Sequence, residues 1–304
     1  MARTTTMAMR WRAVVLLVVV FLASVVQAGF YGKNTEVLNL TPANFDDEIL
    51  NTNHTSIVEF YAEWCGHCKN LRPHFIKAAQ SLSGVAKVAA VHCEDAANKP
   101  LCSRYGVRGY PTLKIFRPST KRGATVPPGG SWKPQPIVED YTGGRHAKAI
   151  SDTVVEKIAN RVKRLKAAEI EGWIAEQNNE RIKVILFTDK ANTPPMFKAL
   201  AVDFANSADF GVVRSADSTT MKKYGASSYP SVVVAARNNE TGESITVLYS
   251  GANKKLQLYY FISQYATPSE GPKAQVDEGP KSKKARKNRK YNQKPPIGGD
   301  HEEL

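Results

Sequence analysis

Two cysteines separated by two residues are the part of this sequence best suited to chemistry. The segment reads Trp64-Cys65-Gly66-His67-Cys68. It follows an apolar stretch that predicts a buried strand, and it opens a stretch that predicts a helix. The unpaired N–H groups and the positive dipole end of a helix N-terminus favour a thiolate at Cys65. Cys68, about one turn later, can attack a mixed disulfide, so the pair could cycle between dithiol and disulfide.

Two other interpretations of the pair have to be weighed. One is half of a structural zinc site, but Cys93 and Cys102 are spaced unlike the second half of a zinc ribbon. The other is a structural disulfide, which would close a very short loop. Four cysteines formally allow three pairings, of which Cys93 with Cys102 is the natural second pair. Redox activity of Cys65 and Cys68 is therefore the preferred interpretation, and no metal is expected.

Strands and helices are expected to alternate along the chain around the cysteine pair, as they do in a single α/β domain. The apolar strand before Cys65 is expected to be parallel and covered on both faces. Pro73 should kink the following helix rather than end it. The Pro- and Gly-rich residues 117–136 are interpreted as an exposed loop insertion. Strands are expected at 37–40, 56–62, 85–91 and 112–116 and near Tyr141, and helices at 42–50, 65–78, 101–105 and 147–162.

The second half of the chain repeats this architecture without the cysteines. The segment Tyr105–Pro111 aligns with Tyr224–Pro230, and such a repeat predicts two copies of one fold. Where the first copy has its cysteines, the second has Asn192–Met196. We therefore predict an α/β protein with two tandem domains, 29–162 and 163–266, each a mixed sheet flanked by helices. In the second domain, strands are expected at 183–187, 210–213 and 231–235 and helices at 195–205 and 219–224.

Both ends of the chain carry candidate targeting signals. Residues 1–28 contain arginines, then an apolar run, then small residues before Gly29, which is the layout of a cleaved secretory signal peptide. A retained membrane anchor is the alternative, but the apolar run is shorter than the roughly 20 residues that a spanning helix needs. The residues His301–Leu304 fit the pattern of endoplasmic reticulum retrieval signals, with Glu302 where Asp is usual. We expect a protein of the endoplasmic reticulum lumen.

The formal charge of +14 says little about partners. Part of it belongs to the predicted signal peptide, and much of the rest to a run of Lys and Arg over 281–290. Residues 267–304 are too polar to form a core and are expected to be a disordered tail. A basic run can bind nucleic acid, but a lumenal location excludes that partner. A solvated tail is preferred over weak binding to acidic proteins or anionic lipids.

The residues around the pair resemble a known family. Ile57–Lys69, together with Tyr105–Thr112, are similar to an active thioredoxin-like domain of the protein disulfide isomerase family. The similarity covers 37–161 well and the second domain more weakly, and the whole architecture resembles the small fungal members. It implies an enzyme that forms, reduces and rearranges disulfides. The partners implied are unfolded or misoxidised secretory proteins, a lumenal thiol oxidase and a retrieval receptor for His301–Leu304.

The resemblance assigns roles within the redox site. Cys65 would be the exposed nucleophile, Cys68 the buried thiol that resolves the mixed disulfide, and His67 a group that stabilises the Cys65 thiolate. The Cys65–Cys68 disulfide would be the only redox group, with no added cofactor. Client contacts are implied at Trp64, Gly66, Tyr110 and Pro111. The resemblance also implies a cis peptide bond before Pro111, with Pro230 as the corresponding residue of the second domain.

Two charged residues are implied in proton handling. Glu59 lies in an apolar strand, where an acid is costly unless it is used or paired, and the matching acid of the family takes a proton from the resolving thiol. The alternative is a strand-edge charge that faces solvent. The family often places a lysine beside this acid, where this chain has Ala90, and Lys87 is expected on the opposite face. Arg108 matches a mobile arginine that lowers the pKa of the resolving thiol; the alternative is an ordinary exposed arginine.

The family also implies a structural disulfide between Cys93 and Cys102. Asn39, Asn53 and Asn239 begin sequons that a lumenal location makes available for glycosylation. Two other functions stay open. One is a chaperone or adaptor that mainly holds clients, and the other is a dedicated reductase, against which His67 argues.

Overall fold

The computed structural model describes residues 29–32, 34–118, 136–176, 181–237 and 244–269. The predicted signal peptide, Asn239 and the retrieval signal lie outside these residues, as do nearly all of the predicted loop insertion and tail. Within the described part of the chain, no helix is long and apolar enough to cross a membrane.

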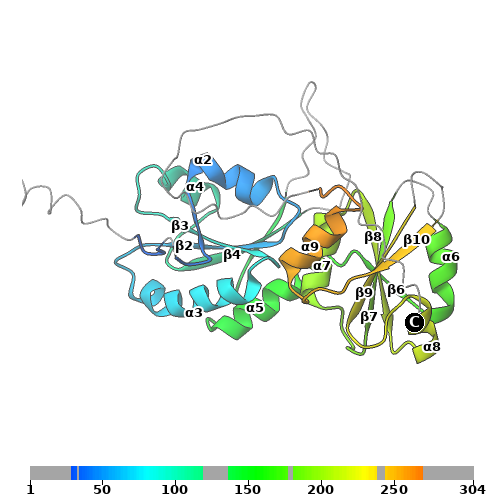
Figure 1. Ribbon diagram of the computed structural model, residues 1–304. Coiled ribbons are helices and arrows are strands. Elements are labelled where there is room, and N and C mark those ends of the chain that lie inside the picture. The colour runs from blue at the N-terminus through cyan, green and yellow to red at the C-terminus, as the bar shows by residue number, and fades with distance from the viewer. Residues whose placement is uncertain (1–28, 33, 119–135, 177–180, 238–243, 270–304) are drawn as a thin grey trace, which may run out of the picture. The chain divides into compact units, whose positions relative to one another are not determined.

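The first sheet has five strands in the order β1-β3-β2-β4-β5. β1, β3 and β2 run parallel, and β4 and β5 are antiparallel to their neighbours. Helices α3 and α5 cover one face, and α2, its π-helical continuation Asp46–Leu50 and α4 cover the other (Figure 1). The bounds are β1 Leu38–Leu40, α2 Pro42–Phe45, β2 Ser56–Tyr61, α3 Gly66–Leu82, β3 Lys87–His92, α4 Lys99–Arg104, β4 Thr112–Arg117, β5 Ile137–Asp140 and α5 Ala147–Glu156. The predicted element order is confirmed.

The central strand β2 is buried over its whole length because helices cover both faces of the sheet. Its alternate residues contribute to two separate cores. Ile57 and Tyr61 pack in the core that contains α3 and α5. Val58 and Phe60 pack in the core that contains α2 and α4. Side chains at the C-terminal end of β2 are thereby held rigidly beside the start of α3.

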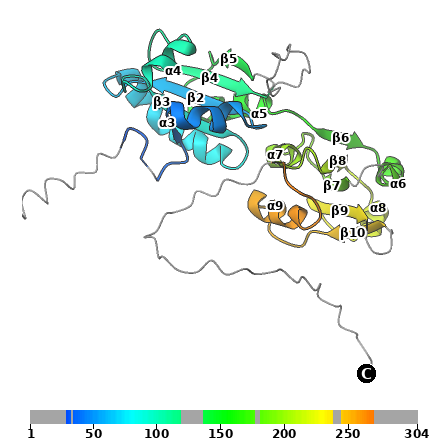
Figure 2. The same ribbon diagram turned by 90° about the horizontal axis from the view of Figure 1, so that it is seen from above.

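The second sheet has the order β10-β9-β7-β8-β6. Followed from β6, its order and strand directions are those of the first sheet. Helices α7 and α9 lie on one face and α6 and α8 on the other (Figure 2). The predicted pair of tandem domains with one topology is confirmed. The bounds are β6 Val162–Leu165, α6 Ile170–Ala175, β7 Ile182–Thr188, α7 Pro195–Asp203, β8 Ala208–Arg214, α8 Ser218–Lys223, β9 Ser231–Arg237, β10 Ser244–Leu248 and α9 Lys255–Ser263.

The structure corrects the helix predicted over 147–162. It ends at Glu156, and Val162 begins β6, where it pairs with Phe210 of the second sheet. Val162 and Leu165 are buried while the two residues between them are exposed, a spacing that also suits a helix, so the sequence pattern does not reveal this strand. Its pairing with β8 defines it. The sequence-based prediction also lacked α6, β10 and α9.

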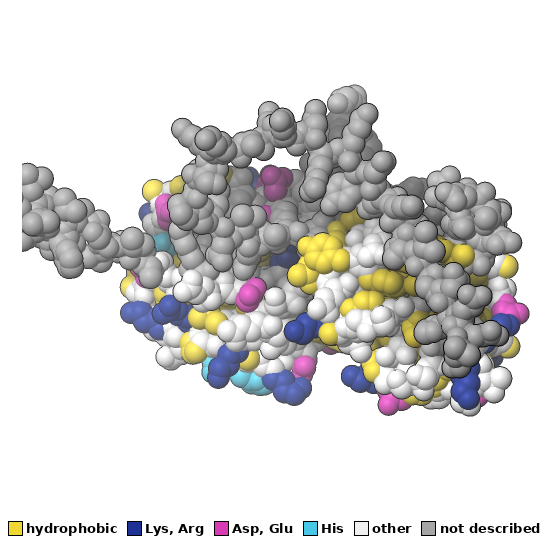
Figure 3. All heavy atoms as spheres, in the orientation of Figure 1, with side chains coloured by type: hydrophobic (Ala, Val, Ile, Leu, Met, Phe, Trp, Pro, Cys, Tyr) yellow, Lys and Arg dark blue, Asp and Glu magenta, His cyan; other side chains and the backbone are white. Residues whose placement is uncertain are grey.

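The described surface carries scattered charges. On the face drawn in Figure 3, Lys and Arg side chains are interspersed with uncharged and apolar ones rather than gathered in one patch.

Candidate active site

Cys65 and Cys68 lie at the start of α3, just after the C-terminal end of β2. Cys65 is the N-cap of α3, and its Sγ accepts a hydrogen bond from the Cys68 backbone N–H at 3.2 Å. Both are free thiols. The expectation of an exposed Cys65 is corrected, since the residue is only 5% exposed. It is still the more accessible of the two, as Cys68 is 0% exposed.

The Cys68 thiol strongly prefers its neutral form. Burial raises its pKa to about 12, helped by the hydrogen bond with Cys65 and by the charges of Glu59 and Cys65. A hydrogen bond from the Ala62 backbone acts in the opposite direction. At neutral pH Cys68 is therefore protonated, and it needs a base before it can act as a nucleophile.

Glu59 supplies a carboxyl group on the same face of the sheet. It is 0% exposed, so the alternative of a solvent-facing strand-edge charge is wrong. Burial raises its pKa to about 7, against the opposing effects of the Tyr31 hydroxyl and the Arg145 charge. It pairs with Ala90 on β3, while Lys87 turns to the other face and donates to the Glu48 carbonyl oxygen at 2.8 Å. The predicted position of Ala90 beside Glu59 is confirmed.

Tyr31 is a site residue that sequence reasoning missed. Its side chain is buried, and its hydroxyl donates a hydrogen bond to Glu59 Oε2. The ring lies edge-on to Tyr61 at 5.7 Å and tilted against Phe75 at 5.9 Å. A single tyrosine outside any periodic element gives no sequence signal. Only its position next to Phe30, in an apolar pair preceding the first strand, hints that this segment packs onto the domain.

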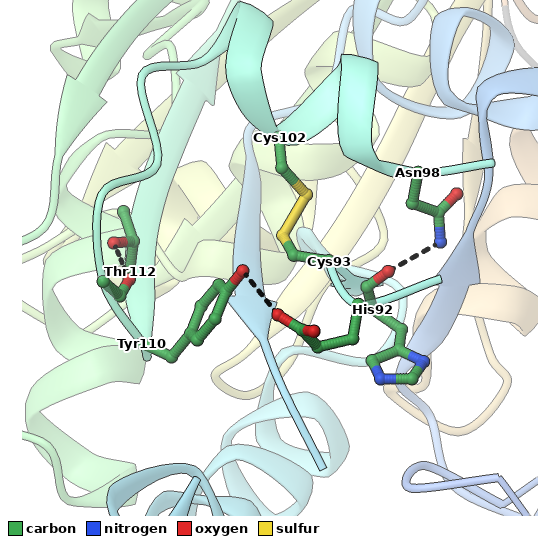
Figure 4. The surroundings of a disulfide bond; sticks show 8 residues. His92, Cys93, Asn98, Cys102, Tyr110 and Thr112 are labelled. Atoms are coloured by element: carbon green, nitrogen blue, oxygen red, sulfur yellow. Dashed lines mark hydrogen bonds between the residues drawn. A yellow bond between two sulfur atoms is a disulfide. The ribbon is translucent and has the colours of Figure 1, made fainter. Parts of the chain in front are cut away.

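The residues implied in client binding lie beside the pair. Trp64 is 69% exposed, and its ring meets that of Tyr110 edge-on at 5.9 Å. Tyr110 packs against the cluster that contains both cysteines, and Pro111 is buried after a cis peptide bond. The Tyr110 hydroxyl donates a hydrogen bond to Glu94 Oε1 at 3.3 Å (Figure 4). Gly66 and His67 are exposed on the first turn of α3.

Arg108 is exposed on the loop between α4 and β4. The pKa of the Cys68 thiol is governed by burial, Cys65, Glu59 and the Ala62 backbone. A contribution of Arg108 to that thiol therefore stays a prediction.

Cys93 and Cys102 form a disulfide that ties the end of β3 to α4 (Figure 4). Both half-cystines are buried in the core on the face opposite Cys65. The intervening turn is further held by Asn98, whose side-chain amide donates to the His92 carbonyl oxygen at 2.9 Å. The disulfide thus lies apart from the redox pair, on the other side of the sheet.

Two of the predicted glycosylation candidates fall in the described residues. Asn39 lies in β1, where its side chain is exposed but its amide donates to the Tyr31 carbonyl oxygen at 2.9 Å. Asn53 lies in the turn before β2 and is partly buried. Modification of Asn39 would therefore compete with a contact that holds Tyr31, whereas Asn53 occupies a connecting turn.

The second domain presents no thiol at the matching place. Its β7–α7 connection ends with Thr193 and Pro194, and α7 begins at Pro195. Its Tyr229–Pro230 bond is cis, as is Tyr110–Pro111 in the first domain. Among the described residues no group of three or more His, Cys, Asp or Glu side chains is arranged to hold a metal ion.

A sheet of this order, with a Cys-X-X-Cys pair at the start of the helix after its central strand, defines a thioredoxin-like dithiol protein. The family model described as Thioredoxin matches residues 36–130. Protein disulfide-isomerase erp38 of Neurospora crassa is 31% identical over 281 residues, which cover 86% of this chain and 69% of that protein. The chain belongs to the protein disulfide-isomerase family.

Two further relatives are similar over a smaller share of their own length. A putative protein disulfide-isomerase of Dictyostelium discoideum is 34% identical, over 79% of this chain and 55% of that protein. Protein disulfide-isomerase MPD1 of Saccharomyces cerevisiae is 39% identical, over 64% of this chain and 62% of that protein. The chain thus spans less than two thirds of these two relatives. Full-length ERdj5, a solved structure, gives a TM-score of 0.45 at 19% identity, over 76% of this chain and 33% of that chain.

Proposed function

We propose that this protein is a thiol–disulfide oxidoreductase that forms, reduces and rearranges disulfides in folding secretory proteins. The observation that carries the proposal is the placement of two free thiols at the N-terminus of α3, with the buried carboxyl group of Glu59 close enough for its charge to act on Cys68. The Cys65–Cys68 pair is proposed as the only redox group, so the reaction uses no added cofactor.

The chemistry proceeds through a mixed disulfide. The Cys65 thiolate attacks a client disulfide, and one client sulfur leaves as a thiolate. Cys68 then loses its proton to Glu59 and attacks the Cys65 sulfur, which breaks the bond to the client and leaves the pair oxidised. Run in reverse, the same steps oxidise a client. Rearrangement results when the released client thiolate attacks another bond before Cys68 acts.

Refolding of a client with scrambled disulfides tests the proposal. The Cys65→Ser variant should lose the activity, because no other thiol in the sequence occupies a helix N-terminus. The Cys68→Ser variant should instead accumulate mixed disulfides with the client, detectable as covalent adducts by mass spectrometry. Full refolding activity of Cys65→Ser would point to a holding chaperone and contradict the proposal.

The proposed location is the endoplasmic reticulum lumen. The layout of residues 1–28, the residues His301–Leu304 and a buried disulfide at Cys93–Cys102 support an oxidising secretory compartment. The proposed partners are unfolded or misoxidised clients, a lumenal thiol oxidase and a retrieval receptor. Removal of the four terminal residues should release the protein into the medium. Glycosidase treatment of the intracellular protein should show a mass shift from Asn53.

A further inference from the structure

We propose that Tyr31 is a positioning residue for the proton step, and that its hydroxyl holds the Glu59 carboxyl group through a hydrogen bond. The inference deepens the proposed oxidoreductase function and rests on it. It adds a residue from the segment before β1, outside the cysteine motif and outside the sheet.

The hydrogen bonds of Glu59 are divided between its two oxygens. Oε2 accepts from the Tyr31 hydroxyl, while Oε1 has no hydrogen-bond partner within the described part of the chain. Across the parallel pair, the neighbour of Glu59 on β3 is the methyl group of Ala90. Tyr31 therefore fixes one oxygen and leaves the other available for exchange with a proton donor.

The Tyr31 ring is anchored by contacts that do not involve its hydroxyl. The ring meets Phe30 and Tyr61 edge-on at 5.1 and 5.7 Å, and it lies tilted against Phe75 at 5.9 Å. Phe30 is held in turn, because it stacks on Tyr61 at 4.6 Å and lies under the Arg72 guanidinium. The Tyr31 carbonyl oxygen accepts from the Asn39 side-chain amide at 2.9 Å. Loss of the hydroxyl alone should therefore leave the ring in place and the domain folded.

The electrostatic surroundings of Glu59 explain what the hydroxyl does. The titratable and charged groups that act on or respond to it are Tyr31, Tyr61, Cys68 and Arg145. Burial and the nearby carboxyl raise the pKa of Tyr31, so it remains a donor at any working pH. Its hydrogen bond favours the Glu59 carboxylate without adding a charge to the core. Without the hydroxyl, burial would keep Glu59 protonated to a higher pH.

The step that depends on the ionised state of Glu59 is resolution of the mixed disulfide. The Glu59 carboxylate takes the proton of Cys68, and the resulting thiolate attacks the Cys65 sulfur. The Cys65–Cys68 bond forms as the Cys65–client bond breaks, and the client sulfur leaves with the electron pair. The proton then passes from Glu59 to the client thiolate or to water. A smaller carboxylate fraction slows this step and leaves the first attack by Cys65 unchanged.

The test is the pH dependence of resolution in the reduced full chain, followed by stopped-flow with a fluorescent disulfide peptide. The Tyr31→Phe variant should shift the midpoint of the profile upward by about one pH unit, the effect of one lost hydrogen bond to a charged group. Resolution at pH 7 should fall about fivefold, while formation of the mixed disulfide is unchanged. The matched control is Tyr141→Phe, because Tyr141 donates to the Gly144 carbonyl oxygen at 2.7 Å and belongs to the same domain.

A double variant separates this role from a structural one. In a Glu59→Gln background, Tyr31→Phe should have no further effect on the profile. The Tyr31→Phe/Ala90→Lys variant should bring the midpoint back down, because it places an ammonium opposite Glu59 in the strand register. An unchanged midpoint in Tyr31→Phe, or an equal effect in the Glu59→Gln background, would overturn the proposal. Failure of the oxidoreductase function is distinct, since the parent protein would then form no mixed disulfide at Cys65.

A second measurement reads the carboxyl group directly. Titration of the Glu59 side-chain carbon by NMR should show the same upward shift of its pKa in Tyr31→Phe and none in Tyr141→Phe. A Glu59 titration that is identical in all three proteins would equally overturn the proposal, whatever the kinetic result.

Discussion

Glu59 and Cys68 both have raised pKa values, about 7 and about 12, and burial is the largest cause of each. The two differ in what else acts on them. Part of the shift at Cys68 comes from Cys65, through a hydrogen bond and a charge, and both are lost once Cys65 is bound to a client. At Glu59 the other influences, the Tyr31 hydrogen bond and the Arg145 charge, lower the pKa, and a client bond at Cys65 removes neither of them. Proton transfer from Cys68 to Glu59 therefore becomes easier only after the mixed disulfide has formed.

The buried carboxyl of Glu59 should make stability depend on pH. Below its ordinary pKa of 4.5 it is protonated in both the folded and unfolded chain, so it has no effect. As pH rises from 4.5 towards the folded value of about 7, only the unfolded chain ionises, and stability is lost. The free energy of unfolding of Glu59→Gln relative to the parent should rise by roughly 2–4 kcal/mol over this window.

Urea unfolding between pH 4 and 8 measures this difference. Both proteins are compared with Cys65 and Cys68 oxidised to the disulfide, so that no thiol titrates. A gap between the two proteins that stays constant over the whole range would show that Glu59 ionises normally in the folded state.

At the scale of elements, the Cys93–Cys102 disulfide lies in a different core from Cys65 and Cys68, so we predict that it stabilises the first domain and is not needed for client turnover. It closes a loop with a sequence separation of 9, which in the loop-entropy model corresponds to about 2–3 kcal/mol. Replacing both cysteines by Ala should lower the melting temperature while client turnover at a temperature well below melting changes little. Calorimetry and a refolding assay on the same protein measure the two effects. Lost turnover with unchanged melting would place this disulfide in the catalytic cycle instead.

The elements that the sequence predicted are those with local signals. β2 is a continuous apolar run, α3 starts at a recognisable motif, and the first domain has the expected order. The missed elements β6 and α6 are short, and their burial depends on partners far along the chain. Tyr31 was missed for the same reason. Its bond to Glu59 joins residues 28 positions apart, and no periodicity marks either side of such a contact.

At the scale of the whole chain, the same topology occurs twice, and only the first copy contains a Cys-X-X-Cys pair. The second copy keeps the sheet order and the cis Tyr229–Pro230 bond, but it has prolines around the start of α7 where the first copy has thiols. The repeat was predictable because Tyr224–Pro230 preserves the pattern of Tyr105–Pro111. The sequence predicts no ligand for the second copy, because the segment that it shares with the first copy, Tyr224–Pro230, contains no side chain that marks a particular chemistry.

One redox pair in the whole chain should give one two-electron transition in an equilibrium titration with glutathione. Protein disulfide isomerase has a potential of about −180 mV and thioredoxin about −270 mV. With His67 between its cysteines, this chain should lie closer to the first value, and trapping with a maleimide should show two thiols lost in the transition. The Cys93→Ala/Cys102→Ala variant is the control and should give the same midpoint. A midpoint near that of thioredoxin would favour a dedicated reductase, because the pair would then be too stable as a disulfide to oxidise clients.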